Sequence, residues 1–316
     1  MLVLSGHEWR LRADEHTQRV TNELADIESR RRRGIKHPVD DFLFQYYNVR
    51  PVQLRTWHPG VGVGLADAEE FADRRFHQVV DGVAVVDSDA FVAHRGSTID
   101  TAHQLLSAAL VKAPRFGCFG MHEWAMVHGL RQEETRHPYL PLRFPPEDIA
   151  RIVEEVGSRC SHIDAFRFFT PSAKPLNLLQ PSRERQADFD QPGCLHVNMD
   201  LYKWAGKLSP AVSSELLVET FVLARDIRVV DMRASAYDLS EWGLAPIRVE
   251  TLEGRAEYAE LQQGFAERAQ PLRRRLVTVI DALQAGTRPV EAPMTRHTSG
   301  QHFDQHTLPS SAKGRL

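Results

Sequence analysis

The sequence predicts a mainly α-helical α+β fold, that is, a compact helical domain with a hairpin and a few short strands. Long segments repeat apolar residues with the period of a helix, and only short stretches alternate like a strand. Hydrophobic residues make up 42% of the 316 residues and charged residues 26%, as in an ordinary globular protein. We therefore expect one large globular domain over 1–286, with a helical N-terminal region over 1–60, and a disordered tail over 287–316.

Helix signals are clear at the start of the chain. Ser5 and Glu8 match a capping box, and the spacing of apolar residues that follows predicts a helix to about Arg33. Pro38 predicts the start of a second helix, because the N–H that proline lacks is not needed in a first turn.

The middle of the chain mixes loop, strand and helix signals. Glycine and proline predict a loop over 56–64, and alternation over 82–95 predicts a β-hairpin that turns at Asp87-Ser88-Asp89. Further helices are expected over 98–112, 121–131, 147–156, 202–208, 215–225 and 253–283. Strand-like segments are expected over 162–169 and 227–235, with a long proline-rich loop over 171–193 that covers a pocket.

Charge and cysteine content limit the class of protein. A net charge of −3 argues against a surface built for nucleic acid, and no apolar run approaches the roughly 20 residues that cross a membrane. Three cysteines, and an N-terminus that turns polar after four residues, predict a cytoplasmic protein without disulfides or a signal peptide. No membrane contact is expected, and protein partners stay open.

Three segments share one design, in which a cysteine precedes a histidine and a carboxylate inside an apolar run. They are GCFGMHEWAMVH with Cys118, His122 and Glu123; RCSHIDAFRFF with Cys160, His162 and Asp164; and GCLHVNMDLYKW with Cys194, His196, Asn198 and Asp200. Burying such groups costs several kcal/mol unless they are paired, bound to metal or used in catalysis. We therefore predict that the segments line one polar pocket; the alternative is core segments whose polar groups only satisfy each other.

The third segment, residues 194–200, leads to the most specific prediction about the site. If 194–200 is extended, His196, Asn198 and Asp200 share one face. Asp200 would then cap a helix that begins there, and Lys203 would pair with it at i, i+3. A carboxylate beside an imidazole and an ammonium predicts a general-base site, with a helix cap and a surface ion pair as the alternative.

The other two segments contain residues suited to an orienting pair or to a metal site. On a strand, His162 and Asp164 share a face, and the carboxylate would orient the imidazole. His128 lies six positions after His122, so the HExxH zinc spacing is missing. The three cysteines and their histidines contain the atoms of a zinc site but no CxxC pair. We predict no metal and no cofactor, with a metal-dependent enzyme as an alternative.

Much of the chain, from about residue 30 to 276, resembles a family of actinobacterial proteins that carry the automatic name 3-methyladenine DNA glycosylase. The similar stretches are RRRRGIKHPVDDFLFQYYNVRPVQLRTWHPG, FGMHEWAMVH, HIDAFRFFTPSAKPLN, CLHVNMDLYKWAGKLSP and VVDMRASAYDLS. The resemblance implies a hydrolase that cleaves the N-glycosidic bond of a purine-like base in a nucleoside, a nucleotide or DNA. It assigns no catalytic residue.

We assign residues of the three polar segments, and a few outside them, to roles in this hydrolysis. Asp200 is the first choice and Glu123 the second for the carboxylate that stabilises the sugar cation and activates water. His196 and Lys203 would set its pKa or protonate the leaving base. The expected binding residues are His162, Asp164, Arg167, Asn198, Trp124, Tyr202 and His58, of which Trp124 or Tyr202 would stack on the base. The second alternative is a non-catalytic nucleobase-binding protein.

Overall fold

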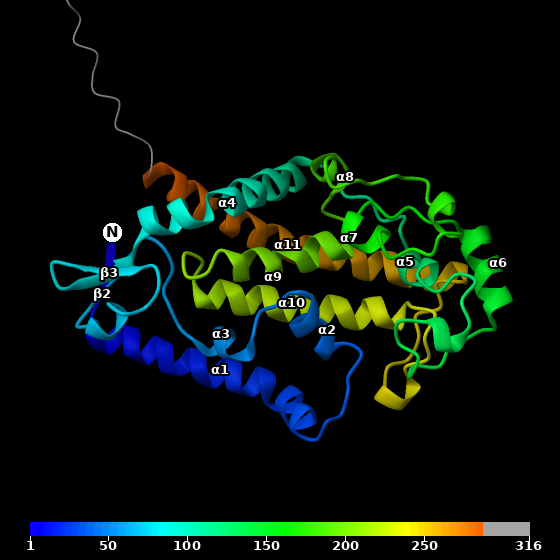
Figure 1. Ribbon diagram of the computed structural model, residues 1–316, viewed down its shortest axis with the longest axis horizontal. Helices are drawn as coiled ribbons and strands as arrows, with labels where there is room; N and C mark the ends of the chain where they lie inside the picture. The colour runs from blue at the N-terminus through cyan, green and yellow to red at the C-terminus, as the bar shows by residue number, and fades with distance from the viewer. Residues whose placement is uncertain (287–316) are drawn as a thin grey trace, which may run out of the picture.

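The computed structural model describes residues 1–286, which form a mainly helical fold with one small sheet (Figure 1). The helices are α1 (Gly6–Arg32), α2 (Asp40–Tyr46), α3 (Pro51–Arg55), α4 (Ser88–Val111), α5 (Met121–Ala125), α6 (Pro146–Val156), α7 (Ile163–Phe166), α8 (Gln186–Phe189), α9 (Leu195–Lys207), α10 (Ser214–Arg233) and α11 (Leu252–Gly286). Short 3₁₀ turns lie at Glu69–Phe71, Gln132–Glu134, Lys174–Leu176 and Ser240–Trp242. The expected mainly α, α+β fold is confirmed.

The long helices form the body of the molecule. α9 packs against α10 and α11, and α11 packs against α4 and α10, with the axes running along the long direction of Figure 1. The largest buried apolar cluster lies between them and extends from Val20 to Leu283. α9 is therefore enclosed on several sides, which places its polar side chains in the interior.

The sheet lies at one end of the molecule, next to the start of α1 (Figure 1). Its strands β1 (Leu2–Leu4), β2 (Val63–Ala66), β3 (His77–Val80) and β4 (Val83–Val86) follow the order β1-β2-β4-β3. β1 and β2 run parallel, and the other pairs are antiparallel. A separate small core of Trp9, Trp57 and Phe71 with its apolar neighbours packs against this end.

The start of the chain follows its local signals closely. The Ser5 hydroxyl accepts a hydrogen bond from the Glu8 N–H, and the Glu8 carboxylate accepts one from the Ser5 N–H, so the capping box is present. The first helix ends one residue before Arg33, as expected. The second helix begins at Asp40, two residues after Pro38.

The hairpin prediction over 82–95 was wrong in its position. The hairpin is β3–β4 and turns at Asp81-Gly82, where both residues have positive φ. Asp87 caps α4 instead, because its Oδ1 accepts a hydrogen bond from the Ala90 N–H at 2.9 Å. The loop predicted over 56–64 also runs into β2, which starts at Val63.

Three segments expected to be extended are helical. Residues 162–169 contain α7, 194–200 begin α9, and 227–235 lie largely in the last turns of α10. Residues 194–200 and 227–235 are buried on nearly every side, so the spacing of their apolar residues does not separate a helix from a strand. In 162–169, apolar and polar residues alternate like a strand, but the segment contains only one short helical turn. Conversely, the helix expected over 121–131 is only α5, which ends at Ala125.

Candidate active site

One cavity of about 220 Å³ lies at the meeting point of α2, α5, α7, α9 and α10. Each of the three polar segments contributes a side chain to its wall: Glu123 from α5, Asp164 from α7 and His196 from α9. The segments therefore do converge on one pocket. Aromatic rings complete the wall, namely Phe42, Tyr46, Phe168 and Tyr237.

The helical form of α9 decides which of its side chains reach the pocket. His196 and Asp200 are one turn apart and share a face, whereas Asn198 points away. The Asn198 amide donates to Pro192 O at 2.9 Å, and its Oδ1 accepts from the Arg273 guanidinium of α11 at 2.6 Å. Asn198 thus anchors the start of α9 to α11. The expected common face of His196, Asn198 and Asp200 was wrong.

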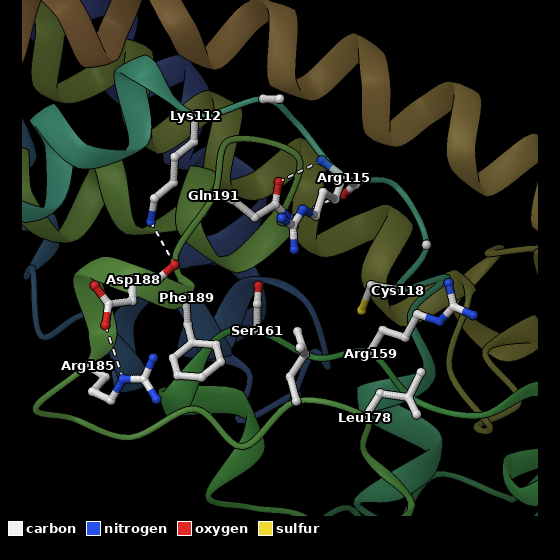
Figure 2. A pocket seen from close by; sticks show the side chains of 13 residues that line it. Lys112, Arg115, Cys118, Arg159, Ser161, Leu178, Arg185, Asp188, Phe189 and Gln191 are labelled. Carbon is white, nitrogen blue, oxygen red and sulfur yellow. Dashed lines mark hydrogen bonds and ion pairs between the residues drawn. The ribbon is translucent and has the colours of Figure 1, made fainter.

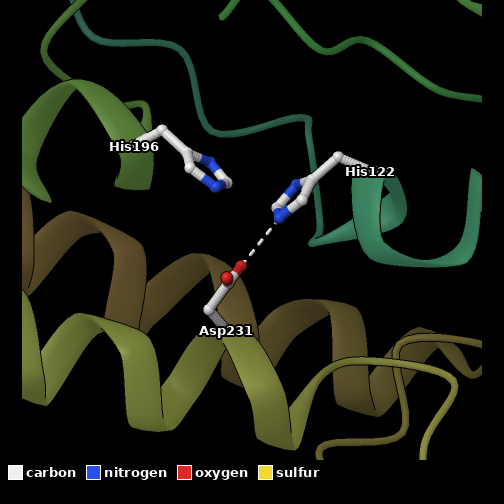
Figure 3. A group of neighbouring side chains, drawn as sticks. All are labelled: His122, His196 and Asp231. Atoms are coloured by element: carbon white, nitrogen blue, oxygen red, sulfur yellow. Dashed lines mark hydrogen bonds and ion pairs between the residues drawn. The ribbon is translucent and has the colours of Figure 1, made fainter. Parts of the chain in front are cut away.

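Three imidazoles form a row beside the pocket. His196 lies in the middle, with its ring centroid 4.5 Å from that of His122 and 5.3 Å from that of His162. Each outer ring meets a carboxylate: His122 Nε2 lies 2.7 Å from Asp231 Oδ1, and His162 Nε2 lies 3.3 Å from Asp200 Oδ2. Figure 3 shows the first of these ends, with His122, His196 and Asp231 facing one another.

An ion-pair network on α10 supports the His122 end, and the sequence pattern did not predict it. Arg228 Nη1 donates to Glu123 Oε1 at 2.7 Å and to Asp231 Oδ2 at 2.5 Å, with all three side chains buried. Arg228 and Asp231 are three residues apart, which brings them together on a helix. The spacing was visible in the sequence, but a strand places such residues on opposite faces.

The other end of the row is held by Lys203. Its ammonium donates to Asp200 Oδ2, and it lies 4.0 Å from Asp164 Oδ2. Arg183 pairs with Asp164 as well. The expected Asp200–Lys203 pair is present, but Asp200 lies in the second turn of α9 and caps no helix. Asp200 is buried and does not line the pocket.

These contacts control the charge of the buried groups. Burial acts to raise the pKa of Asp200, yet the charge of Lys203 and the hydrogen bond from His162 outweigh it and hold this pKa well below its usual range. Burial likewise acts to lower the pKa of His122, but Asp231 outweighs it and raises this pKa well above the usual value. Burial, reinforced by the charge of His122, lowers the pKa of His196 well below its usual value.

The expected stacking residues lie outside the pocket. Trp124 is fully buried, and its indole N–H donates to Ala234 O at 2.8 Å. Tyr202 is also fully buried, packed between Tyr47 and Phe221. Both are core residues in the structure, so rings on α2 and after α7 form the pocket's aromatic wall instead.

Arg167 and His58 are also away from the pocket wall. Arg167 is exposed, with its Nε 3.7 Å from Asp164 Oδ1. His58 is buried at the turn between α9 and α10, where its ring nitrogens lie 3.4 Å from the hydroxyls of Ser209 and Ser214. His58 therefore helps to hold the fold at the far end of α9 from His196.

The cysteines and histidines of the three segments do not form one cluster. Cys160 and Cys194 are buried, and within residues 1–286 only Cys118 is in hydrogen-bond contact with a histidine ring, with its Sγ 3.7 Å from His122 Nδ1. In the region of the chain that the structure describes, the groups able to hold a metal are His122, His196 and Asp231, and His162, Asp164 and Asp200. Neither includes a cysteine.

A second and larger cavity, of about 520 Å³, lies beside α8 (Figure 2). Basic side chains surround it, namely Lys112, Arg115, Arg159 and Arg185, and Cys118 reaches its wall. Some of this charge has a structural use, because the Lys112 ammonium binds the carbonyls of Asp188 and Asp190 at 2.9 and 2.8 Å. None of the catalytic or binding residues expected from the sequence lines this cavity.

Comparison with known proteins found no matching family model, no matching curated protein and no matching solved structure. Within residues 1–286, none of the helices combines the length and the apolar character needed to cross a bilayer.

Proposed function

We propose that the pocket binds a planar, purine-like base and that the protein hydrolyses the N-glycosidic bond to that base. One observation carries the proposal: the rings of Phe42, Tyr46 and Phe168 share a pocket with the carboxylates of Glu123 and Asp164. Bases stack on aromatic side chains, and a carboxylate stabilises the positive charge that develops on the sugar as the base leaves.

The size of the pocket suits the base better than a whole nucleotide. Its volume of about 220 Å³ is below the range of roughly 300–1,000 Å³ that is usual for drug-sized ligands. A base held there would leave its sugar at the mouth. This arrangement is compatible with a nucleoside, a nucleotide or a base flipped out of DNA.

Glu123 is the better candidate for the catalytic carboxylate, because it lines the pocket and Asp200 does not. Arg228 holds Glu123 through Oε1, and no hydrogen bond within residues 1–286 uses Oε2. In the proposed reaction the bond between the sugar carbon and the base nitrogen breaks. Water adds to the carbon, and its proton passes through Glu123 to the departing base. Asp200, His162 and Lys203 position Asp164 and His196.

Base release from methylated purine nucleosides and from alkylated DNA, followed by chromatography, tests the proposal. We expect Glu123→Gln to lower turnover about 100-fold or more while base affinity is retained, because a general base is lost. Asp200→Asn is the matched variant, and its turnover should fall clearly less than that of Glu123→Gln. Melting temperatures and circular dichroism verify that both variants fold.

The alternatives give different results in the same assay. A wild-type protein that binds bases in a thermal-shift screen but releases none is a nucleobase-binding protein and not a hydrolase. A wild-type protein that neither binds nor releases bases contradicts the proposal entirely. Loss of activity in Asp200→Asn equal to that in Glu123→Gln would return the catalytic role to Asp200.

A further inference from the structure

Three side chains of ligand type converge at the His122 end of the histidine row. His122 of α5, His196 of α9 and Asp231 of α10 each offer one ligand atom, and these atoms all lie within 4.8 Å of one another. Figure 3 shows the three side chains facing a common point. Two imidazoles and one carboxylate, leaving further positions open, form a ligand set used for catalytic zinc and for non-haem iron(II).

We propose that His122, His196 and Asp231 bind a divalent transition-metal ion of the zinc or iron(II) type. In a tetrahedral zinc site, bonds of roughly 2.1 Å place two ligand atoms about 3.4 Å apart. The three ligand atoms now lie within 4.8 Å of one another, so side-chain rotations that move them by about 1 Å would form such a site. The open positions of the ion would face the pocket, because His196 lines it.

The state of His196 is an independent observation that points to a ligand. This side chain is only 7% exposed, yet no hydrogen bond in the described region of the chain uses either of its ring nitrogens. The ring borders the pocket, so a group held in the pocket would be the partner that its nitrogens lack within the described residues. The other two rings each meet a carboxylate at Nε2, although Nδ1 of His162 is buried without a partner in residues 1–286. His196 has a hydrogen bond at neither ring nitrogen in this same region and lines the pocket, so it is the ring that an ion beside the pocket would satisfy.

The surrounding charges leave room for a cation. The carboxylates of Glu123 and Asp231 face the single guanidinium of Arg228, which takes Asp231 Oδ2 and leaves Oδ1 to His122. The ion would replace the proton between His122 Nε2 and Asp231 Oδ1, so binding releases one proton. Cys118 Sγ lies at the other nitrogen of the ring, where metal-bound histidines usually find a partner.

The second group, His162, Asp164 and Asp200, already contains its cation. The Lys203 ammonium binds Asp200 and lies 4.0 Å from Asp164, and Arg183 also pairs with Asp164. A metal ion between His162 and the Asp200 oxygen that faces it, Oδ2, would have to displace the ammonium. In the first group Arg228 binds Asp231 Oδ2 and leaves Oδ1 to His122, whereas in the second group Lys203 binds the same Asp200 oxygen that faces His162. This difference makes the second group a matched control.

Metal loading of the full-length protein tests the inference, and it needs no substrate. Protein stripped with a chelator is loaded with Zn²⁺, with Fe²⁺ under anaerobic conditions, or with Mg²⁺, and bound metal is measured by mass spectrometry after gel filtration. Co²⁺ loading adds a visible absorption spectrum that reports nitrogen ligands. The variants are His196→Gln and the control His162→Gln, with melting temperatures to confirm folding.

We expect about one Zn²⁺ or Fe²⁺ per chain in the wild type and in His162→Gln, no Mg²⁺, and at least a 100-fold weaker affinity in His196→Gln. The histidines His297, His302 and His306 are common to all three proteins and cancel in the comparison. Equal binding by His196→Gln, loss of binding in His162→Gln alone, or no bound metal in the wild type would overturn the assignment. None of these outcomes depends on whether the protein cleaves a glycosidic bond.

Discussion

His58 shows how strongly burial acts on a single residue. Burial lowers its pKa to about 3, and the nearby His77, His16 and Arg74 act in the same direction. The ring is therefore uncharged in the folded protein at neutral pH, whereas in the unfolded chain its pKa is about 6.5. Because the unfolded state then binds the proton more readily, the free energy of unfolding falls as pH drops from about 6.5 towards 3.

This linkage gives a measurable difference between two proteins. Between pH 7 and pH 5, the wild type should lose about 2 kcal/mol more of its free energy of unfolding than His58→Gln does. Glutamine has no titrating proton and leaves the other histidines in place. Urea unfolding at both pH values measures the two losses, and losses of equal size would show that His58 does not carry this pH dependence.

At the scale of the element, mutation of Asp87 tests whether this residue caps α4, as the structure shows, or forms the turn of a hairpin. Asp87→Ala should lower the free energy of unfolding by about 1 kcal/mol, because the Ala90 N–H loses its acceptor, and Asp87→Asn should retain most of it. Asp89→Ala is the matched control two residues away, where only a favourable helix-dipole interaction of a few tenths of a kcal/mol is lost. Chemical denaturation should show the largest decrease in the free energy of unfolding for Asp87→Ala. An equally large decrease for Asp89→Ala would contradict the capping role of Asp87.

The same scale explains which elements the sequence could predict. α1 was predictable because Ser5 and Glu8 specify its start locally and one face stays exposed, so its apolar period is visible. The second half of α9 was predicted as the helix 202–208, but its first half was not, because those residues are buried on nearly every side and LHVNMD fits alternation as well as a helix. The deciding information is the packing of α10 and α11 around it, which no local pattern contains.

The candidate site was predictable to the same extent. Glu123, Asp164 and His196 stand out as charge-capable groups in apolar runs, and they do meet in one pocket. Arg228 and Asp231 were missed because a strand assignment separates residues three apart. The aromatic wall was misplaced for a different reason: Trp124 resembles Phe42 in hydrophobicity, and only the tertiary structure decides which ring faces the cavity.

At the scale of the whole molecule, the end of α11 marks the limit of the apolar core. The segment expected to be a disordered tail, 287–316, lies outside the described residues. A protein shortened to 1–286 should keep the wild-type melting temperature, because the segment removed is polar and lacks helical periodicity. A protein shortened to 1–275 should melt several degrees lower, since it loses the buried Leu276, Ile280 and Leu283. Scanning calorimetry tests both; a drop of several degrees for 1–286 would contradict the first expectation.

The contacts between α11 and the start of α9 have a consequence for the order of events during synthesis. Gln262 binds Gly193 O and Arg273 binds Asn198, so the segment that sets His196 in place is secured by the last helix of the described chain. Every residue of the pocket wall precedes Gln262, yet the ribosome must release residue 273 before the wall acquires this support. A nascent or prematurely terminated chain thus contains all the pocket residues while its pocket is still unsupported, and assembly of the site becomes one of the final steps of folding.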